Sequence, residues 1–221
     1  MTEAGGGKQR LLRAAVEYVA ANGVGERSLR QIAAALGTSH RMLIYHFGSK
    51  EGLLVEVVRT VEERQRELLA ELSAADDLAE AGRRFWTRLA DPALWPHERL
   101  FFELYGRALQ GDPAALPLLD GIVDAWVTAL AAPMERAGAE PEVARARARL
   151  GLAVARGLLL DLLATRDRAG VDAAMDQFVR MYAATLPPSP HSRSTSVRDG
   201  AGRGSAGRIG QNGTKHAGGR R

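Results

Sequence analysis

Residues 28–54 read SLRQIAAALGTSHRMLIYHFGSKEGLL and hold two helical segments of fewer than ten residues each, separated by Leu-Gly-Thr-Ser. Helices this short are not stable alone in water, because fixing the first turn costs more conformational entropy than its few hydrogen bonds offset. Longer helices must therefore cover their apolar faces. This constraint predicts a compact helical unit near the start of the chain.

The ends of the two short helices carry residues that satisfy free backbone groups. Ser28 with Gln31 fits a capping box at the start of the first helix. Gly37 can adopt the left-handed conformation that ends this helix, and Thr38 or Ser39 can cap the second. The spacing therefore predicts two helices joined by a tight turn.

The second short helix has two chemically different sides. On a wheel of about 100° per residue we expect Met42, Leu43 and Phe47 in the core. The outward side is rich in hydrogen-bond donors and aromatic rings. It holds His40, Arg41, Ile44 and Tyr45, with His46 near the boundary.

This outward side suits a helix that lies in the major groove of DNA, with the first short helix as its brace. Arg41 can make a forked contact to guanine, worth about 1–3 kcal/mol of discrimination, and Ile44 can touch a thymine methyl group. Polar side chains and the free N–H groups at the helix start can reach phosphates. The alternative is an ordinary helical hairpin whose surface happens to carry these residues.

Charge divides the chain into three parts. Residues 1–50 hold seven Lys/Arg and three Asp/Glu, residues 51–186 hold 16 and 22, and residues 187–221 hold seven and one. A basic start on an acidic body suggests a polyanion as its partner, although scatter over a solvated surface gives the same totals.

The last segment also differs in composition. Sixteen of the 35 residues from 187 to 221 are Gly, Ser or Pro, so the segment cannot bury enough apolar surface to offset its chain entropy. We expect a disordered basic tail, which either adds nonspecific attraction to nucleic acid or is dispensable.

Nearly all of the remaining chain has helical periodicity, and no stretch alternates apolar and polar residues long enough for a strand. The sequence predicts an all-α fold of about nine helices. Besides the two short ones, they span about 8–22, 49–73, 78–89, 96–109, 112–130, 141–166 and 171–186. Asp112-Pro113 is read as a helix start, and Pro117 and Pro133 as bends.

The segments SLRQIAAALGTS and LIYHFGSKEGLL resemble the DNA-binding region of the tetracycline-repressor (TetR) family over about residues 8–60. Two positions depart from the family pattern. Arg41 stands where the family usually has Gly or Pro, and Ile44 where it usually has Tyr, so that Tyr45 falls one place later. Arg41 is therefore expected to add a base contact, and Tyr45 need not make the usual phosphate contact.

The resemblance also implies that Arg30 can touch a base and that Lys50 contacts a phosphate. Together with the wheel, it gives one DNA-binding set. The set is Ser28, Arg30, Thr38, Ser39, His40, Arg41, Ile44, Tyr45, His46 and Lys50.

The resemblance further implies a dimer in which the last two helices of each subunit form a four-helix interface. Residues 150–164 read LGLAVARGLLLDLLA and are apolar on nearly every side, as expected of a helix that covers both its own core and a partner. The alternative is an interior helix of a monomer. The interface set is Leu150, Val154, Gly157, Leu158, Asp161, Leu162, Phe178 and Tyr182.

A small-molecule site within the helical body is also implied, although each candidate wall residue can equally be plain core. The candidates are Trp86, Trp95, His97, Phe101, Phe102, Tyr105, Trp126 and Met134. We expect His97, Glu103 and Asp124 to set its specificity. The predicted domains are residues 1–48 for DNA binding, 49–186 for ligand binding and dimerisation, and 187–221 for the tail.

The functional hypothesis is a cytoplasmic, ligand-responsive transcriptional repressor that binds a pseudo-palindromic operator as a homodimer, with no cofactor or metal. A helical adaptor whose basic start binds a protein or a membrane is the alternative. Catalysis is disfavoured, because the chain has no cysteine, no phosphate loop and no nucleophile elbow, and His97 is the one histidine in the body. The sequence has no run of 18 apolar residues, so we predict no membrane span.

Overall fold

The computed structural model describes residues 3–75 and 77–183, and in these ranges it contains nine α-helices and no strand. This confirms the all-α fold. The helices are α1 (Glu3–Asn22), α2 (Leu29–Ala35), α3 (His40–Phe47), α4 (Lys50–Ala75), α5 (Leu78–Leu89), α6 (Trp95–Leu109), α7 (Ile122–Arg136), α8 (Pro141–Thr165) and α9 (Arg168–Ala183). Two 3-10 turns, η1 (Pro92–Leu94) and η2 (Leu116–Leu119), precede α6 and α7. The predicted tail lies outside the described residues.

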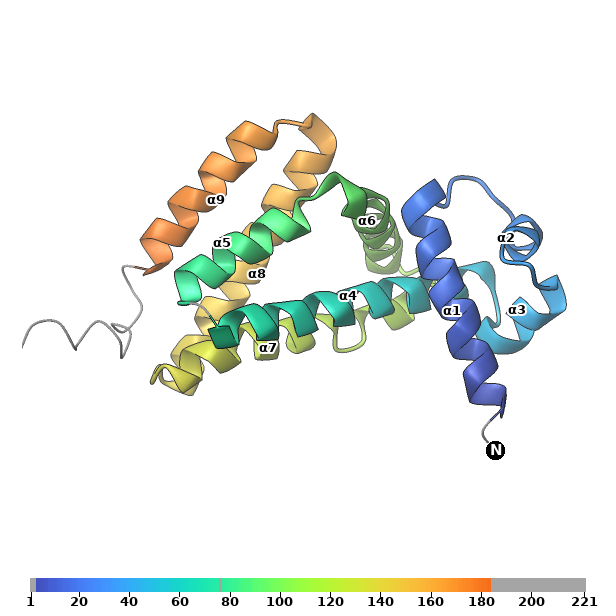
Figure 1. The fold of residues 1–221 in the computed structure, drawn as a ribbon, viewed down its shortest axis with the longest axis horizontal. Helices are drawn as coiled ribbons and strands as arrows, with labels where there is room; N and C mark the ends of the chain where they lie inside the picture. The colour runs from blue at the N-terminus through green and yellow to red at the C-terminus, as the bar shows by residue number, and fades with distance from the viewer. Residues whose placement is uncertain (1–2, 76, 184–221) are drawn as a thin grey trace, which may run out of the picture. The chain divides into compact units, whose positions relative to one another are not determined.

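Helices α1, α2 and α3, here called the head, pack around the first turns of α4 (Figure 1). Their shared core contains residues from all four helices, including Val16, Ile32, Leu43 and Leu53. Leu43 is completely buried, so the short helix α3 is held by its inward face. The two short helices are thus covered by longer ones, as their length requires.

The joint between α3 and α4 depends on a close backbone approach. A Cβ atom on Gly52, in the first turn of α4, would overlap the carbonyl oxygen of Phe47 at the end of α3. Ser49 marks the start of α4, because its Oγ accepts a hydrogen bond from the Gly52 N–H at 2.9 Å. Glycine at this position therefore allows the end of α3 and the start of α4 to pack closely.

The other helices, α4 to α9, form the body. Helix α7 packs along both α4 and α8, while α5 lies between α4 and α9 (Figure 1). Two apolar clusters hold these helices together, one centred on Trp126 and Met134 and the other on Trp86 and Leu159.

One helix start was placed wrongly from the sequence. Asp112 does cap a turn, since its Oδ1 accepts from the Ala114 N–H at 3.0 Å, but α7 begins only at Ile122. Gly121, with φ 69°, separates η2 from α7. Pro133 lies inside α7 without ending it. An N-cap followed by proline is compatible with a single turn as well as with a helix, which explains the error.

The expected core position of Met42 was also wrong, because its side chain is 41% exposed. Five residues at about 100° each place Met42 about 140° away from Phe47, outside the buried arc. Leu43 and Phe47 are buried as expected, whereas Ile44 and Tyr45 are exposed.

Within the described residues, the segment Leu116–Arg136 is long and apolar enough to cross a membrane by length and composition alone. The segment is interrupted at Gly121, and Trp126, Val127 and Ala131 pack into an apolar cluster with α8. We interpret it as a core segment of the body.

The burial of Leu43 yields a stability prediction. Leu43→Ala removes a fully buried side chain from a helix of only eight residues and is expected to lower the free energy of unfolding by about 2–5 kcal/mol. The matched control is Tyr45→Ala, whose side chain is 72% exposed. The control should change stability by no more than about 0.5 kcal/mol. Urea unfolding followed by circular dichroism measures both, and equal losses would contradict the assigned anchor.

Candidate nucleic-acid interface and internal cavity

Side-chain caps fix the start of α2 and the start of α3. At the start of α2 the Ser28 N–H donates to Gln31 Oε1 at 2.8 Å, and the Gln31 N–H donates to Ser28 Oγ at 3.3 Å. At the start of α3 the Met42 N–H donates to Ser39 Oγ at 3.2 Å. The predicted capping box is therefore present, and Gly37 has a φ of 64°. Gly37 and the Ser39 cap thus shape the turn between α2 and α3, while the Ser28 capping box fixes the start of α2.

All ten residues of the predicted DNA-binding set keep part of their side chains at the surface. Seven are exposed, namely Ser28, Arg30, Ser39, His40, Arg41, Ile44 and Tyr45, and three are half-buried, namely Thr38, His46 and Lys50. Arg41 makes no hydrogen bond or ion pair with any described residue, so its guanidinium is available to a partner. The arrangement presents a donor-rich surface on a helix anchored from behind.

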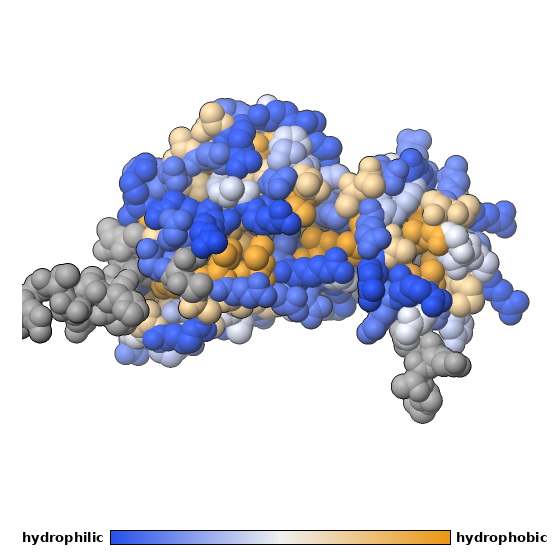
Figure 2. Space-filling model, in the orientation of Figure 1, coloured by the Kyte–Doolittle hydropathy of each residue, from blue (hydrophilic) through white to orange (hydrophobic). Residues whose placement is uncertain are grey.

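A cavity of about 160 Å³ lies in the body, with residues of α4 to α9 in its walls. Hydrophobic surface is visible on the body near α4 and α5 (Figure 2). Five of the eight candidate ligand residues line this cavity. They are Trp86, Phe101, Phe102, Trp126 and Met134.

The other candidates lie elsewhere, which corrects the prediction. His97 is buried against the head, where its Nε2 lies 3.1 Å from the Val16 carbonyl oxygen of α1. Tyr105 packs on Phe101 outside the cavity lining. Glu103 and Asp124 are exposed, so they cannot set the specificity of an internal site.

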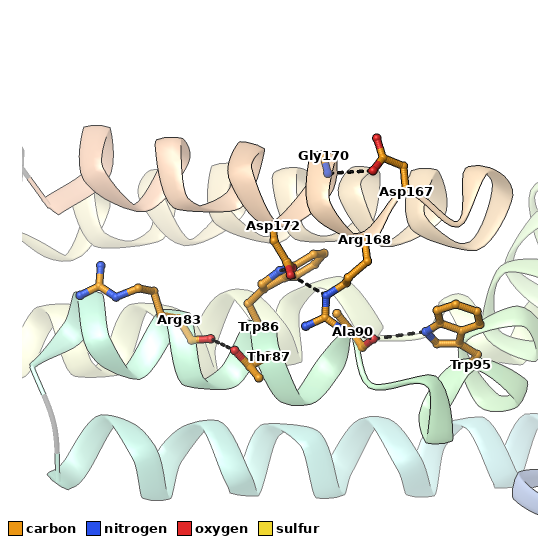
Figure 3. Close-up of polar contacts among 9 residues, drawn as sticks. All are labelled: Arg83, Trp86, Thr87, Ala90, Trp95, Asp167, Arg168, Gly170 and Asp172. Carbon is orange, nitrogen blue, oxygen red and sulfur yellow. Dashed lines mark hydrogen bonds and ion pairs between the residues drawn. The ribbon is translucent and has the colours of Figure 1, made fainter.

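Trp95 was also misplaced, since it belongs to a polar network between α5 and α9 (Figure 3). Its Nε1 donates to the Ala90 carbonyl at 3.3 Å, and Arg168 Nη1 donates to the same oxygen at 3.0 Å. Asp172 accepts from Arg168 Nε at 2.7 Å and from Trp86 Nε1 at 2.7 Å. This network fixes the Trp86 ring as a wall of the cavity.

Four polar side chains at the cavity, here called the polar cluster, were not predicted from the sequence as site residues. They are Glu62, Gln65, Glu98 and Arg156. Gln65 Nε2 donates to Glu98 Oε1 at 2.6 Å, and Trp126 Nε1 donates to Glu62 Oε2. Arg156 Nη2 lies 3.9 Å from Glu62 Oε2, and its guanidinium stacks 5.0 Å from the Phe101 ring centroid.

Burial governs the protonation of both carboxyl groups. It raises the pKa of Glu98 to about 8, which the Gln65 hydrogen bond offsets in part and repulsion by Glu62 reinforces. Burial also raises the pKa of Glu62, against the opposing hydrogen bond from Trp126 and the charge of Arg156. The sequence signal for this cluster was the interruption of the apolar stripe of α4 near Gln65 and the single arginine within the apolar run of α8.

The predicted interface residues fall into three groups. Leu150, Gly157 and Asp161 are exposed, and Val154 and Leu158 are half-buried. Phe178 and Tyr182 are half-buried and line the cavity. Leu162 is completely buried within the subunit, so it cannot contact a partner and is removed from the set. Helix α8 is not buried all round, because Leu150 is 54% and Leu160 is 51% exposed.

Residues 11–57 match the sequence model of the family described as bacterial regulatory proteins, tetR family. No curated protein matches the chain. A transcriptional regulator from Rhodococcus sp. Rha1 is similar at 24% identity and a TM-score of 0.66, over 83% of this chain and 99% of that one. A TetR-family transcriptional regulator from Pectobacterium atrosepticum is similar at 18% identity and a TM-score of 0.68, over 86% and 98%.

NalD, the secondary repressor of the MexAB-OprM multidrug efflux pump in Pseudomonas aeruginosa, is similar at 19% identity and a TM-score of 0.54, over 83% of this chain and 98% of that one. At these identities the solved structures establish the fold. The sequence match covers residues 11–57, which form most of the head and the first turns of α4.

The raised pKa of Glu98 predicts a pH-dependent stability. The folded state keeps a proton that the unfolded chain releases near pH 4.5, so the free energy of unfolding falls as the pH rises from about 4.5 to about 8. Glu98→Gln removes this loss. At pH 5 the variant should melt at nearly the same temperature as the wild type. At pH 8 it should melt several degrees above the wild type.

Thermal unfolding at a series of pH values measures this difference. The exposed Glu103 on the same helix provides the control, since Glu103→Gln should give a difference that does not vary with pH. His97, whose pKa burial lowers, is present in all three proteins and cancels. If the melting temperatures of Glu98→Gln and the wild type differ by the same amount at every pH, Glu98 is ionised in the folded protein.

Proposed function

Because the chain carries the helix-turn-helix domain of the TetR family, we propose that it is a ligand-responsive repressor of transcription that binds a pseudo-palindromic operator as a homodimer. The observation that carries this proposal is the outward face of α3. Arg41, Ile44 and Tyr45 project from a helix whose Leu43 and Phe47 are buried behind them. We place its action in the cytoplasm, where it reaches DNA, and assign it no catalytic activity.

Base recognition is assigned to Arg41 and Ile44. The guanidinium of Arg41, which has no partner among the described residues, provides two parallel donors for guanine O6 and N7, and Ile44 offers an apolar contact for a thymine methyl group. Tyr45, Lys50 and the free N–H groups after Ser39 are assigned to phosphates. The cap at Ser39 and the left-handed Gly37 support this assignment, because they lie in the turn that joins α3 to its brace.

Dimerisation is assigned to an exposed stripe on α8. The stripe recurs every three or four residues and consists of Ala146, Leu150, Ala153, Gly157, Leu160 and Ala164, all of which are exposed in the single chain. Such a spacing makes one apolar face, and small residues let a second helix approach closely. Ala173, Ala174 and Met181 are exposed on α9. Two copies related by a two-fold axis would cover both helices.

A dimer places two α3 helices about one DNA turn, roughly 34 Å, apart. An effector that favours another separation weakens operator binding, and a coupling of about 1–3 kcal/mol corresponds to a 5- to 150-fold change. Helix α4 is the proposed lever, since it begins beside α3 and carries Glu62 and Gln65 into the cavity. The similarity of the fold to NalD, which is a repressor, supports repression over activation.

Operator binding is tested first with Arg41→Ala and with Arg41→Ala combined with Tyr45→Ala. The single change should weaken binding about 5- to 150-fold, equivalent to about 1–3 kcal/mol, and the double change should weaken it further. Gel shifts on DNA selected from the genome by the purified protein measure the affinity. Wild-type affinity should also fall steeply with salt.

The control for this experiment is Arg136→Ala, which removes an exposed arginine at the end of α7. It should leave operator affinity unchanged. If the double variant keeps full affinity, α3 does not read the groove, and an adaptor that binds a protein or a membrane through its head becomes the better proposal.

The dimer is tested with Leu150→Glu combined with Leu160→Glu. Two carboxylates on the exposed stripe should repel those of the partner, so sedimentation velocity should show a monomer and operator affinity should fall. Leu109→Glu is the control, because Leu109 is 67% exposed on α6, away from the stripe. A persistent dimer in the double variant, with helicity intact, would rule out this interface.

A further inference from the structure

We propose that the effector of this protein is an apolar molecule with one positive charge, which sits in the body cavity with its charged group against Glu98. The inference rests on the proposed function only in taking this cavity as the effector site. It concerns the chemistry that the cavity recognises.

Glu98 has fewer favourable neighbours than the other buried carboxyl group, Glu62. Glu62 has three favourable neighbours, namely the Trp126 N–H and the guanidinium groups of Arg156 and Arg66. Glu98 is only 3% exposed and accepts one hydrogen bond, from the neutral amide of Gln65. Glu62 repels it, and Arg156 gives it weaker attraction. A buried carboxylate with so few partners is costly unless a positive charge joins it.

The walls around this carboxyl group suit an apolar cation. Phe101, Phe102, Trp86 and Trp126 line the cavity, and aromatic faces attract cations, especially where water is excluded. A cavity of about 160 Å³ is close to the roughly 150 Å³ that accepts benzene in another protein. The volume therefore suits a small ligand built on one aromatic ring, and the aromatic walls suit a positive charge on it.

Without a bound cation, Glu98 keeps its proton at neutral pH, because burial raises its pKa to about 8. The charged groups facing it are Glu62 on α4 and Arg156 on α8, while Arg147 acts on Tyr182 elsewhere in the lining and His97 points to α1. When the cation enters, the Glu98 carboxyl O–H bond breaks, the proton leaves to solvent, and the carboxylate pairs with the ligand. One positive charge enters and one leaves, so the net charge of the site is unchanged.

An anionic ligand is the competing chemistry, because Arg156 Nη2 is buried and has no hydrogen-bond partner in the described part of the chain. Such a ligand would lie beside the Glu62 carboxylate, 3.9 Å from that same nitrogen. Repulsion by Glu62 would oppose it, and the guanidinium face is already stacked on Phe101 and Tyr105. Repulsion by Glu62 and the contacts that Arg156 already makes therefore favour the cation over the anion.

The experiment compares phenyltrimethylammonium with tert-butylbenzene, its neutral isostere, and with the anion benzenesulfonate. Binding to the full chain is followed by tryptophan fluorescence, since Trp86 and Trp126 line the cavity. At pH 8 the cation should bind at least about tenfold more tightly than either other probe. Its affinity should fall about 50-fold from pH 8 to pH 6, because Glu98 must lose a proton, whereas that of tert-butylbenzene should stay constant.

Two further measurements separate a specific charge contact from general effects. Calorimetry in phosphate and in Tris buffer at pH 7 should report release of about one proton per bound cation. Glu98→Gln should abolish the preference for the cation and the pH dependence while still binding tert-butylbenzene, which shows that the cavity is intact. Glu103→Gln, on the exposed side of α6, should behave like the wild type.

Equal or tighter binding of the neutral probe or of the anion would overturn the proposal, as would failure of all three probes to bind. These results are distinct from failure of the proposed function. If tert-butylbenzene binds best and releases operator DNA, the proposed function is supported and the proposal of a cationic effector is wrong. If the cation binds through Glu98 but the protein binds no DNA, the cation stands and the regulator is wrong.

Discussion

Helix α4 takes part in the core of the head, in the apolar cluster around Trp126 and in the wall of the body cavity. Its first turn meets the backbone of α3 at Gly52, where no side chain fits. Its next turns place Leu53 and Val57 in the core of the head, and its middle carries Glu62 and Gln65 into the body cavity. One continuous helix therefore joins the core that holds α3 to the polar cluster. A shift in either region must be accommodated by α4.

Burying the polar cluster lowers the stability of the fold, which indicates that the cluster has a role other than folding. Apolar side chains of similar size at Glu62 and Glu98 would fill the same space without desolvating carboxyl groups. The fold instead keeps Glu98 protonated and holds Glu62 with one indole N–H and nearby arginines. Sites that bind ligands commonly accept such a penalty, because polar groups prepared in an apolar cavity provide selectivity.

The sequence predicted those features that local chemistry determines. The capping box at Ser28, the helices predicted at 78–89 and 141–166, and the outward side with Arg41 follow from local spacing, and each agrees with the helices described. The polar cluster could not be predicted in this way, because Glu62 and Glu98 come from different helices and look like surface charges in the sequence. The misplacement of His97 has the same origin, since only the packing of α6 against α1 shows which way it faces.

Helix α8 shows why an apolar run is ambiguous until its surroundings are known. Arg156 reaches the cavity and the stacked rings of Phe101 and Tyr105, whereas the next residue, Gly157, lies on the exposed stripe. Two neighbouring positions thus face the two regions assigned to ligand and partner. A ligand that changes the charge beside Glu98 alters the forces on Arg156, and a rigid helix transmits any resulting shift to the face that a second subunit would cover. The length of the apolar run in α8 therefore reflects two surfaces on one helix, and coupling between them requires no additional element.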